Sequence, residues 1–170
     1  QYKDQEIDEY KSNPFIEALP EILEVDTVIK RVSYFPKHSD EQRKLSKAVR
    51  LHLVQSLSSF VFPMPAHLSI EQRLSRLIRY GYIGRNPLSP QFNRQFAIGF
   101  RELLDGGVDE TGANFAGIRS SAAAFAIIGV SGQGKTTAME NTLLLYPQVI
   151  QHANYKGTIL PMKQLVWLKL

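Results

Sequence analysis

The segment Gly129–Thr136 constrains the fold of this 170-residue chain more than any other stretch. It reads GVSGQGKT and so has the spacing G-x-x-x-x-G-K-T of a phosphate-binding loop. Such a loop joins a buried strand to a helix, and here it follows the apolar run 122–128 and precedes a helical pattern over 135–145. The motif therefore predicts an α/β fold, a P-loop NTPase with a parallel sheet that begins at this run.

The residue types in this loop suit a triphosphate. Glycines permit positive φ angles and close approach of the backbone, so the amides from Ser131 to Thr136 can form a nest for phosphate oxygens. Lys135 is the predicted catalytic residue, because its ammonium would lie between the β- and γ-phosphates, and the Thr136 hydroxyl would ligate Mg²⁺. The alternative is a structural glycine turn with an exposed lysine. With ATP and Mg²⁺ as the expected cofactors, the predicted binding residues in the loop are Gly129, Ser131, Gly132, Gln133, Gly134, Lys135, Thr136 and Thr137.

Composition restricts the other kinds of chemistry. The absence of cysteine excludes a disulfide scaffold, a thiolate metal site and a cysteine nucleophile. The four histidines do not have the spacing of metal ligands. The longest apolar stretch falls far short of the ~20 residues that a membrane span needs, and no signal-like segment begins the chain. We expect a soluble, cytoplasmic protein with no membrane partner.

The charges are distributed unevenly. Residues 72–101 contain six arginines and no acid, whereas residues 1–30 contain eight acids against three lysines. An arginine-rich stretch is either a solvated helix face or a contact surface for the phosphates of a nucleotide or nucleic acid. The sequence leaves both interpretations open.

Helical periodicity covers much of the region before the loop. One amphipathic helix is predicted over 40–59, with Ser39 or Asp40 as its cap. A second should begin at Ile70 behind the capping box of residues 69–72 and end at Gly81. Its predicted solvent face carries Arg76 and Arg79.

Further signals complete the predicted arrangement. Ser89 and Pro90 begin a third helix that the glycines 106–107 end, and residues 106–117 are predicted to be a surface loop or linker. Beyond the phosphate-binding loop, short strands are predicted at 149–150 and 164–170, and these would extend a right-handed parallel βαβ unit.

These patterns divide the chain into three parts. Residues 1–35 form an acidic N-terminal arm that could dock a partner, residues 36–117 form a helical region with the basic stretch and a linker, and residues 118–170 begin an incomplete P-loop domain. Both ends give the impression of a fragment, because the chain lacks an initiator methionine and stops within a predicted strand.

Several segments resemble one family. They are YKSNPFIEALP at Tyr10–Pro20, RLIRYGYIGRNP at Arg76–Pro87, GVSGQGKTT at Gly129–Thr137, and YPQVI followed by QLVWLKL. In this order they are similar to the TnsC group of AAA+ regulators of DNA transposition, which is related more distantly to TniB and IstB. The loop motif alone is shared by many ATPases, whereas GYIGRNP and YPQVI are much narrower signals.

The resemblance implies an ATP-switched protein that assembles head-to-tail on DNA as a homo-oligomer and links a target-selector protein to transposase subunits. It further implies that Tyr82, Ile83 and Arg85 form the adenine pocket, although Gly81 and Gly84 could equally make a simple helix-ending turn. The family's acidic strand, sensor, arginine finger and lid are absent from the sequence. We therefore expect weak nucleotide binding and little hydrolysis from this chain, and whether it is itself an enzyme stays open.

Two other functions are compatible with parts of the sequence. A small-molecule or nucleotide kinase could use the same loop, but kinases usually place it close to the N-terminus, whereas 128 residues precede it here. Alternatively, the first 120 residues could be a protein-docking module with a secondary nucleotide site.

Overall fold

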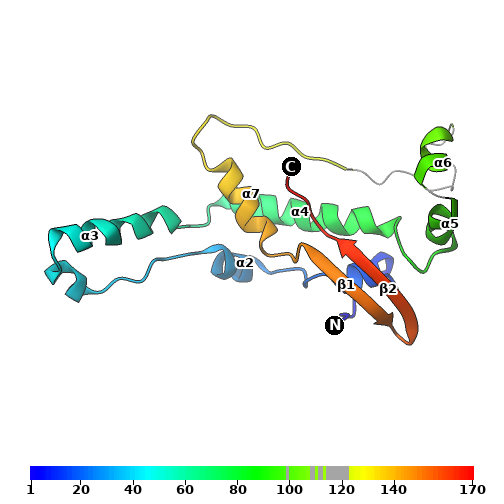
Figure 1. The fold of residues 1–170 in the computed structure, drawn as a ribbon, viewed down its shortest axis with the longest axis horizontal. Helices are drawn as coiled ribbons and strands as arrows, with labels where there is room; N and C mark the ends of the chain where they lie inside the picture. The colour runs from blue at the N-terminus through cyan, green and yellow to red at the C-terminus, as the bar shows by residue number, and fades with distance from the viewer. Residues whose placement is uncertain (99, 108–109, 111–112, 114–122) are drawn as a thin grey trace.

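The computed structural model describes residues 1–98, 100–107, 110, 113 and 123–170 (Figure 1). Within these ranges the chain is mainly helical and carries one small sheet. The helices and strands are η1 (Asp8–Tyr10), α1 (Pro14–Glu17), α2 (Val25–Val32), η2 (Asp40–Lys44), α3 (Lys47–Val54), η3 (Gln55–Ser59), α4 (Pro65–Ile83), α5 (Pro90–Ile98), α6 (Phe100–Asp105), α7 (Lys135–Leu143), β1 (Val149–Tyr155) and β2 (Thr158–Leu165).

The sheet differs from the prediction. Strands β1 and β2 form an antiparallel hairpin, so the predicted parallel βαβ pairing is wrong for this pair. The physical reason is the two-residue turn Lys156–Gly157, in which both residues have positive φ angles, 45° and 89°. Such a turn matches the twist of a tight hairpin and leaves no room for a crossover helix. The predicted strand 164–170 is also misplaced, because β2 ends at Leu165.

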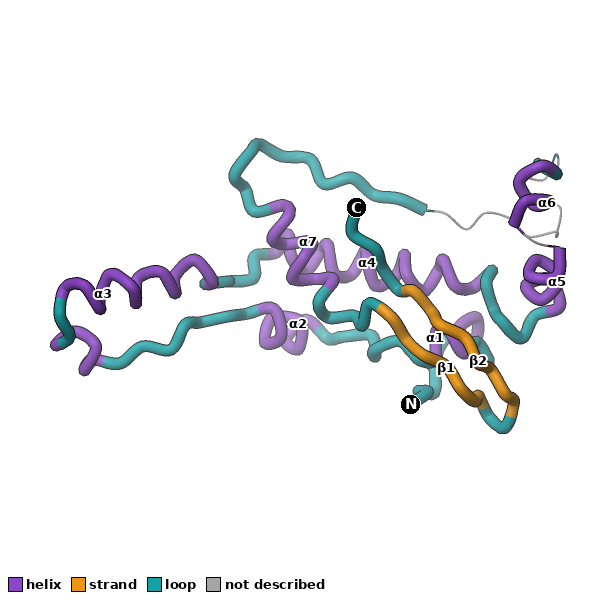
Figure 2. The backbone as a smooth tube through the Cα atoms, viewed as in Figure 1, coloured by secondary structure: helices purple, strands orange, loops and turns teal. Residues whose placement is uncertain are grey.

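The apolar run before the phosphate-binding loop is not a strand in its described part. Residues 123–128 belong to no helix or strand, and Ile128 is 94% exposed. Figure 2 draws this segment as a loop that runs apart from both strands. A parallel strand needs a hydrogen-bonded neighbour, and no described segment pairs with this one. The predicted buried strand is therefore wrong for 123–128, and residue 122 lies outside the described ranges.

The predicted helix 40–59 is divided into η2, α3 and η3. Ser39 is the N-cap residue of η2, one of the two caps that the sequence predicts, and its amide donates to the Oε1 atom of Gln42 at 3.3 Å. Ser46 begins a new helix by accepting a hydrogen bond from the amide of Val49 at 3.5 Å. The apolar side chains of this region are largely exposed. Tertiary packing is what normally sustains a long helix, so its absence explains the division.

Helix α4 is longer than predicted at both ends. It begins at Pro65 rather than Ile70, and it continues through Gly81 to Ile83. Pro65 suits the first helical position, and the Nδ1 atom of His67 accepts a hydrogen bond from the amide of Met64 at 3.1 Å. These two features begin the helix one turn before the capping box that the sequence suggests.

The third predicted helix is confirmed at both of its ends. Helix α5 begins at Pro90, and the hydroxyl of Ser89 accepts a hydrogen bond from the amide of Phe92 at 3.2 Å. Helix α6 ends at Asp105, directly before Gly106. Most of the predicted linker 106–117 lies outside the described residues.

The main core joins the N-terminal segment to the C-terminal half of α4. Phe15, Ile16 and Leu19 of the segment pack with Tyr82 and Phe92, and the ring centroids of Phe15 and Tyr82 are 5.5 Å apart. The side-chain amide of Asn13 donates to the carbonyl of Tyr82 at 2.7 Å. The hairpin covers this core, and α7 packs on α4 (Figure 1).

Residues 33–64 form a projecting arm. The chain leaves the body after α2, passes through η2, α3 and η3, and returns to the start of α4 (Figure 1). One bridge between Tyr34 and Val61 closes its base. In the described ranges, none of the helices combines the length and apolar character needed to cross a membrane.

Candidate phosphate-binding loop

The loop 129–134 lies directly before α7, and two of its glycines have left-handed backbone angles. Gly132 has φ of 81°, and Gly134, the N-cap residue of α7, has φ of 73° and ψ of 20°. Residues other than glycine are strained at these left-handed backbone angles. The loop thus adopts a conformation that its glycine positions permit, and it opens a helix as the motif predicts.

The backbone amides of this region point to an anion site. The first helical hydrogen bond runs from the amide of Ala138 to the carbonyl of Gly134 at 2.8 Å. Within the described part of the chain, the amides of residues 131–137 donate to no backbone carbonyl. Most of these residues are exposed. Several exposed donors at the positive end of a helix dipole favour an anion such as phosphate.

Lys135 adds a cation to the same place. Its ammonium donates to the carbonyl of Gly129 at 2.8 Å and to that of Val130 at 2.7 Å. The side chain therefore folds back over the loop instead of extending into solvent. These two bonds hold the ammonium at the loop, and an anion would have to replace both carbonyls as its acceptor.

The other predicted loop residues surround these groups. The side chains of Ser131, Gln133, Thr136 and Thr137 are exposed. A Cβ atom built on Gly129 would lie 2.4 Å from the Oε1 atom of Gln133. The hydroxyl of Thr136 is accessible to a metal ion, and the described residues contain no group of three His, Asp or Glu side chains that could hold one by itself. The loop thus supplies one hydroxyl ligand, and the remaining ligands would come from phosphate and water.

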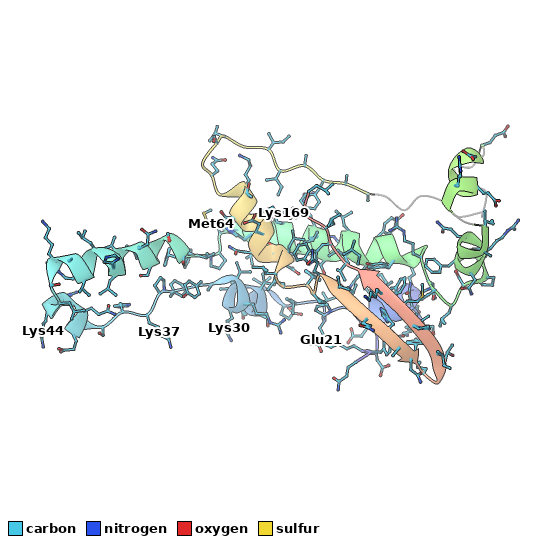
Figure 3. The ribbon with its side chains drawn as sticks, in the orientation of Figure 1. Glu21, Lys30, Lys37, Lys44, Met64 and Lys169 are labelled. Atoms are coloured by element: carbon cyan, nitrogen blue, oxygen red, sulfur yellow. The ribbon has the colours of Figure 1, made fainter. Side chains whose placement is uncertain are left out.

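Helix α7 is anchored to the body on the side opposite its exposed start. Ala138 and Thr142 are buried, and the Thr142 hydroxyl donates to the carbonyl of Ala138 at 2.8 Å. Lys169 forms an ion pair with Glu140, and it is labelled beside α7 in Figure 3. The anchored helix therefore presents its N-terminal loop to solvent while its other face is fixed.

The predicted adenine-pocket residues lie apart from this loop. Tyr82 is buried in the main core, where its hydroxyl donates to the carbonyl of Leu165 at 2.8 Å. Ile83 is half-buried against the same core, and Arg85 is exposed. These residues lie at the end of α4 nearest α5, whereas α7 begins beside the other half of α4 (Figure 1). The structure of one chain does not bring them together with the phosphate-binding loop.

The arginines of α4 face in different directions. Arg73 and Arg76 are exposed and, together with Tyr80 and residues 123–125, line a hollow of about 390 Å³. Arg79, which was predicted to face solvent beside Arg76, is only 2% exposed, so that prediction is wrong. The reason is that its guanidinium donates inside the protein, to the Ser75 hydroxyl at 2.6 Å and to the carbonyl of Pro20 at 2.5 Å.

A buried polar cluster near α7 was not predicted from the sequence. It consists of Glu71, Ser75 and Arg79 from α4 and Tyr146 from the segment after α7. The hydroxyl of Tyr146 donates to the Oε1 atom of Glu71 at 2.8 Å, and burial raises the pKa of Tyr146 above its ordinary value of 10.0. The spacing of Glu71, Ser75 and Arg79, four residues apart, places them on one helix face and could have indicated a shared environment. The cluster fixes the C-terminal end of α7 to α4.

A second buried network holds the hairpin on the N-terminal segment. The Gln164 amide nitrogen donates to the carbonyl of Phe15 at 2.8 Å, so its Oε1 atom must accept from His152, whose Nε2 atom lies 2.9 Å away. The Nδ1 atom of His152 is then free to accept from the Tyr2 hydroxyl at 2.9 Å. The two contacts join His152 to Gln164 and to Tyr2, and they give the histidine a structural role.

Comparison with known proteins does not assign a family. No protein-family model matches the chain, and no curated protein matches it either.

Proposed function

We propose that this chain binds a nucleoside triphosphate, ATP with Mg²⁺, through residues 129–137. The observation that carries the proposal is the Lys135 ammonium held over the loop at 2.8 Å and 2.7 Å from two carbonyls, beside amides that have no backbone partner in the described ranges. Phosphate oxygens could accept from both kinds of donor at once. The ammonium would exchange the carbonyls of Gly129 and Val130 for the β- and γ-phosphates.

The chemistry that these residues supply is binding rather than hydrolysis. The amides and the ammonium would neutralise phosphate charge, and the Thr136 hydroxyl would provide one Mg²⁺ ligand. Hydrolysis also needs a carboxylate that orders Mg²⁺ and water, and the described residues near the loop provide no metal-binding cluster. We therefore propose weak turnover for this chain by itself.

The wider proposal is an ATP-dependent regulator of DNA transposition of the TnsC type, an AAA+ ATPase. It is supported by the resembling segments, because three of them contact one another. Tyr10–Pro20 packs on Arg76–Pro87, and Gln164 of the segment QLVWLKL donates to the carbonyl of Phe15. These three segments thus form one structural unit. Residues that pack together in this way are the ones we expect related proteins to share.

A route from nucleotide to DNA follows from the same contacts. The proposed nucleotide site lies at the start of α7, and Tyr146 ties the end of this helix to Glu71 of α4. Helix α4 exposes Arg73 and Arg76, which could contact DNA phosphates. A nucleotide that changes the position of α7 would therefore also change α4. In the complete assembly, this change would couple ATP to DNA, and through DNA to the target selector and the transposase.

Sedimentation of the intact protein tests this proposal. With double-stranded DNA and a non-hydrolysable ATP analogue, the wild-type protein should form assemblies larger than those formed without nucleotide. Lys135→Ala should abolish the difference, because the ammonium contributes a charge-assisted bond worth about 1.5–3 kcal/mol, a 10- to 100-fold loss of nucleotide affinity. Assemblies of equal size with and without nucleotide would contradict the proposed dependence of assembly on ATP. Unchanged nucleotide affinity in Lys135→Ala would contradict the proposed nucleotide site at residues 129–137.

A further inference from the structure

The arm formed by residues 33–64 carries an unusually apolar exposed surface. Monomeric proteins rarely gather so many large exposed apolar side chains in one place, and such patches usually mark an interaction site. Leu51, Leu57 and Phe62 are the most exposed of the group, at 63%, 62% and 63%. The exposed large apolar residues of the arm are Tyr34, Phe35, Leu45, Val49, Leu51, Val54, Leu57, Phe60, Phe62 and Met64.

Part of this surface is a groove of about 460 Å³. Its apolar lining includes Leu53, Leu57 and Phe60. The charged residues that line it are three basic ones and one acid, namely Lys37, Arg43, Arg50 and Asp40. The arm has five Lys and Arg residues against two acids, a net charge of +3. Within the described part of the chain, Lys37 and Arg50 form no ion pair, so both remain available to a partner. The groove suits an acidic segment with apolar anchors.

The chain itself contains a segment of that chemistry. Residues 20–27, PEILEVDT, have three acids and no basic residue, a net charge of −3. Ile22 is 58% exposed and Val25 is 41% exposed. Residues 21–24 are not part of a helix or strand, so their backbone can adapt to a groove. Exposed apolar side chains between carboxylates are complementary to an apolar groove with a basic rim.

Within one molecule the two surfaces do not meet. Figure 3 labels Glu21 on the body and Lys37 and Lys44 on the arm, and the arm projects away from the body. We therefore propose that the groove of the arm binds the segment 20–27 of a second copy of this chain. The two surfaces differ, so the contact is heterologous and each copy can use both surfaces to form a ring or filament. The contact involves neither the loop 129–137 nor a nucleotide, so it can hold or fail independently of the proposed function.

Sedimentation velocity of the chain over a range of concentrations tests the contact. The wild type should show association that grows with concentration, without nucleotide, and Lys135→Ala should behave in the same way. Leu57→Asp should weaken association about 10- to 100-fold, the loss expected for one buried leucine anchor. The matched control is Ile159→Asp on the hairpin, because Ile159 is 80% exposed and lies outside both surfaces. A wild type that is monomeric throughout, or equal effects of both aspartates, would overturn the proposal.

Charge reversal makes the test specific to the two surfaces. Arg50→Glu and Glu24→Arg should each weaken association about 2- to 5-fold, the range of an exposed ion pair, and the double variant should recover most of the loss. A labelled peptide of residues 20–27 should bind the wild type and not Leu57→Asp. Additive losses in the double variant would overturn the pairing. If an unrelated acidic peptide bound and the peptide 20–27 did not, the groove would belong to another partner. This outcome would also overturn the proposed self-association.

Discussion

Removing the Tyr146 hydroxyl should destabilise the fold by a measurable amount. This hydroxyl donates to the Glu71 Oε1 atom at 2.8 Å, and both residues are almost fully buried, at 3% and 2% exposed. Tyr146→Phe keeps the ring and leaves the carboxyl without this donor. A hydrogen bond to a charged group contributes about 1.5–3 kcal/mol, so we expect the free energy of unfolding to fall by about 2 kcal/mol.

Urea unfolding followed by circular dichroism measures this change. With an m-value of about 2 kcal/mol/M, the loss corresponds to a midpoint about 1 M lower, with the m-value unchanged. Tyr80→Phe is the control, because Tyr80 lies on α4, the helix that carries Glu71, and is 54% exposed. Its midpoint should move by about 0.3 M or less, as for an ordinary surface substitution. Equal midpoints for the two variants would refute the reasoning that the cluster ties α7 to α4.

Three further predictions concern other parts of the molecule. Burial raises the pKa of Tyr82 and Tyr146 above 10.0. The free energy that favours the folded state with both phenols neutral is therefore complete below pH 10 and is lost as the pH rises through the raised pKa values. The urea midpoint should fall in that range, and less steeply in Tyr146→Phe. Gly134→Ala should lower stability by about 1–2 kcal/mol in thermal unfolding, because φ is 73° at this position, whereas Gly129→Ala should cost less, since only the flexible end of Gln133 is in its way. Asn13→Ala should cost about 0.5–2 kcal/mol in urea unfolding, because its side chain caps α1 and donates to the carbonyl of Tyr82; no change would show that this buried amide adds nothing.

Local signals explain which parts of the fold could be predicted. Ser89 and Pro90 begin a helix because the hydroxyl of the first and the fixed φ angle of the second act within one turn. Gly132 and Gly134 permit the positive φ angles of the loop without help from distant residues. The start of α7 at Lys135 follows in the same way. Each of these features depends on a few neighbouring residues, which the sequence displays directly.

Long-range contacts explain what could not be predicted. Arg79 has the spacing of a surface residue, yet it is buried because Pro20, distant in sequence, offers it a carbonyl. The turn Lys156–Gly157 lacks the usual asparagine or aspartate before glycine, so the sequence carries no strong hairpin signal at this point. Residues 123–128 are as apolar as a buried strand, but a strand also needs a neighbour, and composition does not show whether one is present.

An amide NMR titration with ATP and Mg²⁺ reports on phosphate binding at residues 129–137 residue by residue. The amide signals of Ser131–Thr137 should move and saturate, even when the affinity is low, and Lys135→Ala should need about 10- to 100-fold more ATP for the same shifts. Signals that stay unchanged in this loop, or that move only around the exposed arginines of α4, would contradict phosphate binding at this loop.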